Sequence, residues 1–211
     1  MKAGKLGFLV LLLMIAPLAA HADYTWGPGS GDCGSCYGAT YNLNIVGNPA
    51  GDTFTVTLTI NTAGAIPGVS GQYISGVGFG DGKDIKSVDL IATTAGPLNI
   101  WSETTGNINS SGACDGTPGN KACSQQNSDV SPFQYAKADG STYSWTWVVV
   151  FTTPGLNTNL ADIHLSAQYQ NQNGSTGHIV SETALTMPEA PLAASLGVGL
   201  GLLAFRLRRK K

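Results

Sequence analysis

The stretch from residue 23 to residue 186 contains no arginine and only four lysines, against twelve carboxylates. Its net charge at neutral pH is therefore −8. A surface with so few cations cannot neutralise the phosphates of a nucleic acid or the charges of an anionic polymer. The composition excludes nucleic acid as a partner and leaves neutral sugars and divalent cations as ligand classes.

The sequence also lacks the motifs of the common catalytic sites. It has no His-Glu-x-x-His, no phosphate-binding glycine loop and no serine, histidine and aspartate in the order of a known triad. Only two histidines follow residue 22, and His164 alternates with Ile163 and Leu165, so we expect it on the polar face of a strand. We therefore predict a protein that is not an enzyme.

The second histidine, His178, follows the turn signal Asn173-Gly174. If these two residues form a hairpin turn, residue 178 pairs with Tyr169. We then expect His178 on an apolar face, as a hydrogen-bonded core residue. The same register places Glu182 beside Leu165, which favours a β-bulge at this point.

The first 22 residues have the three parts of a cleavable secretory signal. Lys2 and Lys5 form a basic start, an apolar stretch begins at Leu6, and Ala20-His21-Ala22 is a small-x-small cleavage site. Cleavage after Ala22 leaves Asp23 as the new N-terminus. The alternative is an uncleaved anchor helix, which Pro17 argues against. The sequence thus predicts engagement with the export machinery.

The other end of the chain carries a second apolar segment. Residues 190–205 are 16 uncharged residues, about 24 Å of helix, which is short for a hydrocarbon core of about 30 Å. Three glycines, Gly197, Gly199 and Gly201, weaken this helix. The basic tip contains Arg206, Arg208, Arg209, Lys210 and Lys211. By the positive-inside rule the tip stays in the cytoplasm, and the body lies outside the inner membrane.

The segment 187–211 resembles the PEP-CTERM sorting domain of Gram-negative bacteria. The resemblance rests on Pro188-Glu189, the apolar span and the arginine-rich end, in that order. The sequence departs from the family at Ala190, where a second proline is usual, and proline follows at Pro191.

The resemblance implies processing by an exosortase, a membrane transpeptidase linked to extracellular polysaccharide systems. The processing enzyme would read Pro188 and Glu189 and remove the helix and basic tip. The protein would be anchored in the inner membrane in transit, and would then reach the cell surface, the extracellular space or the biofilm matrix. A plain single-span anchor is the alternative, and it has the same topology.

Between the two segments, residues 23–186 predict one all-β domain, an antiparallel sandwich or jelly roll of seven or eight strands. The clearest strand is Thr53 to Ile60, in which threonines alternate with Phe54, Val56, Leu58 and Ile60. Residues 145–151 are apolar on both faces, as in a central strand. The predicted strands are 41–45, 53–60, 73–79, 88–91, 98–101, 145–151, 163–169 and 177–184. Residues 104–129 predict a long loop.

All four cysteines, Cys33, Cys36, Cys114 and Cys123, lie in the exported domain, which indicates disulfides. We prefer Cys33–Cys36 with Cys114–Cys123, because the residues between the second pair form turns. The alternative ties the N-terminal loop to the long loop by two parallel bridges. A redox Cys-x-x-Cys should head a helix, and a four-thiolate zinc site is rare outside the cytosol, so we favour neither.

From these features we rank three possible functions. A structural or interaction protein of the surface comes first. A carbohydrate-binding module for the associated polysaccharide comes second, with Trp26 and Trp101 stacking on sugars while Trp145 and Trp147 pack in the core. A glycan-active enzyme comes last, and it would need a carboxylate pair. Its candidates are Asp81, Asp84, Asp89 and Glu103.

No cofactor is expected. The segment Gly80-Asp81-Gly82-Lys83-Asp84 resembles a fragment of a calcium loop. It lacks the remaining ligands and the closing glutamate, so calcium is only a minor alternative.

Overall fold

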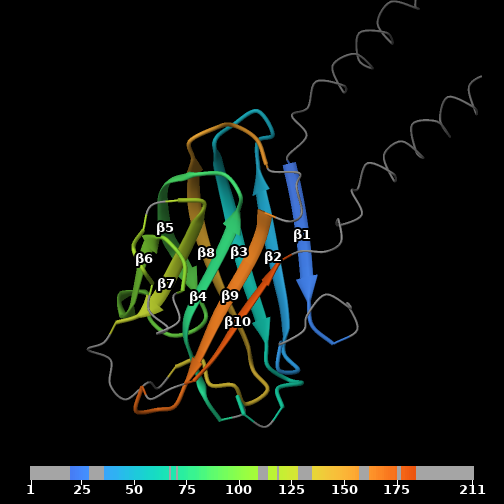
Figure 1. The fold of residues 1–211 in the computed structure, drawn as a ribbon, viewed down its shortest axis with the longest axis vertical. Helices are drawn as coiled ribbons and strands as arrows, with labels where there is room; N and C mark the ends of the chain where they lie inside the picture. Colours follow the sequence, from blue (N-terminus) through green and yellow to red (C-terminus); the bar gives the residue numbers. More distant parts are fainter. Residues whose placement is uncertain are drawn as a thin grey trace, which may run out of the picture.

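The computed structural model describes residues 20–28, 36–66, 68–69, 71–108, 114–117, 119–127, 135–156, 162–174 and 177–183. Over these ranges the chain forms ten β-strands and one short 3-10 helix (Figure 1). The strands make two antiparallel five-stranded sheets that face each other. The predicted all-β class is confirmed, and the expected count of seven or eight strands was too low.

The first sheet has the order β1-β2-β3-β8-β5 and the second has the order β10-β9-β4-β7-β6. The strands are β1 (Ala20–Trp26), β2 (Thr40–Gly47), β3 (Thr53–Asn61), β4 (Tyr73–Asp81), β5 (Ile85–Thr93), β6 (Trp101–Thr105), β7 (Lys121–Gln126), β8 (Thr142–Phe151), β9 (Ile163–Gln170) and β10 (His178–Thr183). The 3-10 helix η2 spans Leu98–Ile100.

The first sheet forms because its strands alternate apolar and polar residues. In β3 the side chains of Phe54, Val56, Leu58 and Ile60 are buried, and the threonines between them face outward. Strands β2 and β3 form the predicted hairpin, with Leu43 opposite Leu58. Strand β8 lies between β3 and β5, so its prediction as a central strand is confirmed.

Aromatic side chains fill the space between the sheets. Trp147 of β8 lies 5.1 Å from the ring of Phe79, and its indole N–H donates to Ser124 Oγ at 2.7 Å. Trp145 packs edge-on against Trp101 at 5.4 Å. These contacts join the two sheets, and the predicted core position of Trp145 and Trp147 is confirmed.

Two tyrosines form another polar link across the core. The hydroxyl groups of Tyr41 in β2 and Tyr169 in β9 lie 2.6 Å apart, and both side chains are fully buried. Each hydroxyl therefore has a hydrogen-bond partner without water, which burial requires. Burial raises the pKa of Tyr169 to about 12.

Two expectations about the middle of the chain were wrong. Strand β7 lies inside the predicted loop 104–129 and pairs with both β4 and β6. The predicted strand 98–101 is instead the helix η2, which follows Pro97, with Ile100 N–H donating to the Pro97 carbonyl at 3.3 Å. Strand β6 begins only at Trp101, where the chain returns to an extended conformation.

Of the two predicted terminal segments, only residues 20–22 are among the described residues. Ala20 to Ala22, the expected end of the signal peptide, form the start of β1. The remaining residues of the predicted signal helix and the predicted span 190–205 lie outside the described residues. Within the ranges given above, no helix is long and apolar enough to cross a membrane.

Candidate functional site: a polar sheet face under a disulfide-bonded loop

A row of glycines runs along β4 on the outer face of the second sheet. Gly76, Gly78 and Gly80 alternate with Val77 and Phe79, which point into the core. Their neighbours across the sheet are Gln168, Ser166 and His164 on β9, and Gln125, Cys123 and Lys121 on β7. We call these residues together the polar face.

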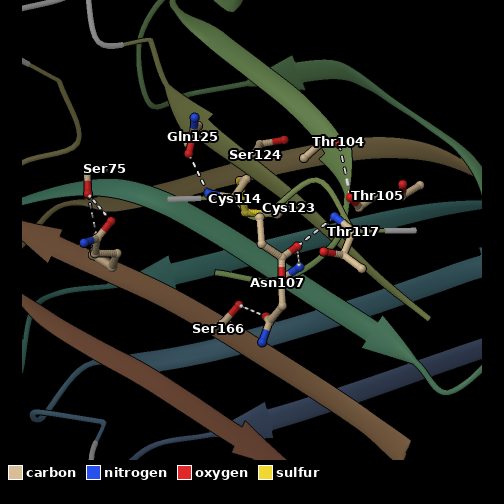
Figure 2. The surroundings of a disulfide bond; sticks show 12 residues. Ser75, Thr104, Thr105, Asn107, Cys114, Thr117, Cys123, Ser124, Gln125 and Ser166 are labelled. Carbon is tan, nitrogen blue, oxygen red and sulfur yellow. Dashed lines mark hydrogen bonds between the residues drawn. A yellow bond between two sulfur atoms is a disulfide. The ribbon is translucent and has the colours of Figure 1, made fainter. Parts of the chain in front are cut away.

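A loop covers part of the polar face and is attached to it at several points. The disulfide Cys114–Cys123 joins the loop to β7 (Figure 2). Ser166 Oγ donates to Asn107 Oδ1 at 3.2 Å, and the Cys114 N–H donates to Gln125 Oε1 at 2.6 Å. We call residues 106–117 the covering loop, of which 106–108 and 114–117 are described.

The covering loop packs on the glycine row at Gly76. Ile108 is 6 % exposed, and its Cδ1 atom lies 3.5 Å from the position that a Cβ atom would take at Gly76. At the base of the loop, Asp115 Oδ1 accepts hydrogen bonds from the N–H groups of Asn107 and Thr117, both at 3.1 Å. The polar face is therefore a packing surface for the chain's own loop.

The predicted pairing of Cys114 with Cys123 is confirmed. This bridge excludes the alternative in which both cysteines of the long loop are tied to the N-terminal loop. It also removes two thiolates from the zinc interpretation. Cys36 is disulfide-bonded as well, and Cys33 lies outside the described residues.

His164 lies on the polar face of β9, as predicted, but it is buried there. It is 8 % exposed, because β9 lies inside the sheet with β4 on one side and β10 on the other. Its Nε2 atom lies 3.1 Å from Ser181 Oγ. Burial, together with the nearby Lys121 ammonium, lowers the pKa of His164 to about 4.

The pair of Ser181 and His164 was not predicted from the sequence, and it resembles part of a catalytic triad. A serine nucleophile needs a base with a pKa near the working pH, held in place by a third group. The low pKa makes His164 a weak base. The pair is therefore a structural hydrogen bond between β9 and β10.

We expect the stability of the domain to fall in mild acid because of His164. Its folded-state pKa of about 4 lies below the value of about 6.5 in an unfolded chain. The neutral form stabilises the fold fully above pH 6.5, and this contribution is lost as the pH falls toward 4. The loss should be at most about 3 kcal/mol.

Urea unfolding at a series of pH values measures this loss, with His164→Gln as the comparison. In a plot of the free energy of unfolding against pH, the variant should lack the fall between pH 6.5 and 4 that this histidine causes. His178→Gln is the control and should keep that fall. An unchanged fall in His164→Gln would contradict the assignment.

The predicted register around His178 is confirmed, but its role is not. His178 pairs with Tyr169 and Glu182 pairs with Leu165, in a regular ladder without the expected bulge. Glu182 needs no bulge, since β10 is an edge strand and the side chain is only half-buried. The His178 ring is half-buried against Tyr37, at 4.8 Å, so it is not a core residue.

The predicted carboxylates differ in burial. Asp81 is fully buried at the end of β4, whereas Asp84 (in the turn after β4), Asp89 (on β5) and Glu103 (on β6) are exposed. Lys83 of the calcium-like segment donates to the carbonyls of residues 154 and 155, at 2.7 and 2.8 Å. In the part of the chain that the structure describes, no three acidic, histidine or cysteine residues cluster as a metal site would require.

The prediction that Trp26 and Trp101 stack on sugars was wrong. They are 1 % and 5 % exposed, and both indole N–H groups are bonded within the fold. Trp26 donates to the Thr183 carbonyl at 3.0 Å, and Trp101 donates to the Ala95 carbonyl at 3.3 Å. Among the described residues the exposed large hydrophobic side chains are Ile66, Ile91 and Leu98, none of them aromatic.

The sorting residues lie outside the described residues. They are Pro188, Glu189, Ala190, Pro191, Arg206, Arg208 and Arg209. The cleavage-site residues Ala20, Ala22 and Asp23 lie in β1.

No family model matches the chain, and no curated protein matches it either. One similar solved structure comes from a study of pH-induced modulation of Streptococcus parasanguinis adhesion by Fap1 fimbriae. It is 14 % identical to this chain, and the alignment covers 80 % of this chain and 84 % of that one, with a TM-score of 0.28. Two domains of the major pilin SpaD from Corynebacterium diphtheriae are 15 % identical, over 79 % of this chain and 50 % of that one, with a TM-score of 0.30. Similarity at this level supports no argument about function.

Proposed function

We propose that this chain is an exported structural or interaction protein of the cell surface or extracellular matrix, sorted by its PEP-CTERM-like segment at residues 187–211. The observation that carries the proposal is the order of features in the sequence. A secretory signal precedes the domain, and Pro188-Glu189, an uncharged span and a basic tip follow it.

The described domain is compatible with this role. It is all-β, and the Cys114–Cys123 disulfide suits an oxidising compartment. The low pKa of His164 makes it a weak base, and the buried tryptophans offer no stacking surface for sugars. A structural or interaction role is therefore favoured over the carbohydrate-binding and enzymatic alternatives.

In this role the tail holds the protein in the inner membrane until an exosortase-like enzyme acts. That enzyme would read Pro188 and Glu189 and separate the domain from the span and basic tip. The released or transferred domain would then lie outside the cell, next to surface polysaccharide.

Intact mass spectrometry of membrane and extracellular fractions from the native host tests the proposal. We expect a mature extracellular species that starts at Asp23 and ends near Pro188. Glu189→Gln should keep the tail and stay in the membrane fraction. The exposed Glu103→Gln is the control and should be processed normally.

Two other results would contradict the proposal in different ways. A wild-type species that keeps Arg206 to Lys211 and is found only in membranes would indicate a plain anchor. A cytoplasmic species that still starts at Met1 would contradict export itself.

A further inference from the structure

Strand β1 extends across the predicted signal cleavage site. It runs from Ala20 to Trp26 and pairs with β2 along its whole length, with Ala22 opposite Ile45 and Asp23 opposite Asn44 (Figure 1). The bond to be cut, between Ala22 and Asp23, therefore lies inside a β-ladder of the folded domain.

The Ala22 side chain, next to this bond, is buried. Ala22 is 8 % exposed and belongs to the hydrophobic core. A signal peptidase recognises the small side chain at this position, and a protease binds such a segment as an extended strand. On the outer face, the Asn42 amide donates to Asp23, and His21 and Asn44 are hydrogen-bonded at 2.9 Å. Both faces of β1 are thus engaged around the cleavage site.

The end of β1 is held by the last described strand. Trp26 is 1 % exposed, and its indole N–H donates to the carbonyl of Thr183 at the end of β10. These residues are 157 positions apart in the sequence. This contact of β1 can therefore form only after β10 has been synthesised and has joined the second sheet.

We propose that the Ala22–Asp23 bond is a cryptic processing site, which a signal peptidase can cut only while β1 is not yet docked on β2 and β10. The proposal rests on the signal peptide of the proposed function. Cleavage adds water across the peptide bond, which leaves a carboxylate on Ala22 and an ammonium group on Asp23. Processing precedes the completion of the fold, and a precursor that folds first keeps its N-terminal segment.

The test compares the folded, disulfide-bonded full-length precursor in detergent micelles with a peptide of residues 8–30. Each is incubated with a purified bacterial signal peptidase, and intact mass gives the rate at which product starting at Asp23 appears. We expect the peptide to be cut at least a hundred-fold faster than the folded precursor. In a urea titration, cleavage of the precursor should follow the unfolded fraction until the peptidase itself loses activity against the peptide.

Two tryptophan variants separate local opening of β1 from general loss of stability. Trp26→Phe removes the bond to Thr183 and should raise the cleavage rate of the folded precursor about five-fold. Trp101→Phe removes a similar indole bond, to the Ala95 carbonyl, away from β1, and should leave the rate unchanged at equal unfolded fraction.

The outcomes are distinct. Equal cleavage of the peptide and the folded precursor would overturn the cryptic site and leave the signal assignment intact. Equal effects of the two tryptophan variants would overturn the role of the Trp26 contact. Failure to cut either substrate after Ala22 would overturn the signal assignment and, with it, this proposal.

Discussion

Replacing Trp147 by alanine should lower the free energy of unfolding by about 4 kcal/mol. The indole is fully buried, packs against Phe79 at 5.1 Å and donates to Ser124 Oγ at 2.7 Å. The substitution leaves a cavity between the sheets and removes the hydrogen bond that links them. Because domains of this size are stable by only about 5–15 kcal/mol, this loss is a large fraction of the free energy of unfolding.

Three further variants separate the free-energy cost of the cavity from that of the lost hydrogen bond. Trp147→Phe keeps most of the ring volume and leaves Ser124 without its donor, which should cost about 1–3 kcal/mol. Adding Ser124→Ala removes the unpaired hydroxyl and should recover part of that loss. Urea unfolding of the two single variants and the double variant measures the coupling. Additive losses would contradict a direct bond between these residues.

Replacing Gly78 by alanine should destabilise the domain by about 1–3 kcal/mol. A Cβ atom at this position would lie 2.6 Å from Ser166 Oγ and 3.0 Å from the Ala122 carbonyl oxygen. Ser166 would have to move, and it would then lose its hydrogen bond to Asn107 in the covering loop. We therefore expect faster hydrogen exchange in the described parts of this loop, as well as a lower urea midpoint.

Gly119→Ala is the matched control, since no heavy atom lies within 4 Å of the Cβ position at Gly119. Its urea midpoint should equal that of the wild type. Combining Gly78→Ala with Ser166→Ala removes the nearest clashing atom and should recover part of the loss. A Gly78→Ala protein as stable as Gly119→Ala would show that the sheet tolerates a side chain under the loop.

The sequence predicted best the strands in which local pattern and burial agree. The β2–β3 hairpin followed from strict alternation, and the β9–β10 register followed from the turn Asn173-Gly174. Strand β7 could not be predicted in this way. Its inward residues Ala122, Ser124 and Gln126 are small or polar, and they are buried only because tertiary contacts such as the Trp147 bond hold them.

The errors in the candidate site have one physical cause. Alternation tells which face of a strand a residue occupies, but it does not tell what covers that face. His164 was correctly separated from the core side of β9 and is buried nonetheless. Trp26 was grouped with Trp101 as a residue open to sugars, yet its N–H donates to the carbonyl of Thr183, far along the chain. Such partners are fixed only by the folded topology.

The bond between Trp26 and Thr183 also determines how the domain would respond to mechanical load. A protein tethered through the chain that follows Thr183 and pulled by its surroundings receives the force first at the end of β10. At that point the first and last described strands are joined, since the Trp26 indole is fixed in the core and holds the Thr183 carbonyl. Peeling β10 from β9 at this end therefore also breaks the hydrogen bond that holds β1 of the other sheet.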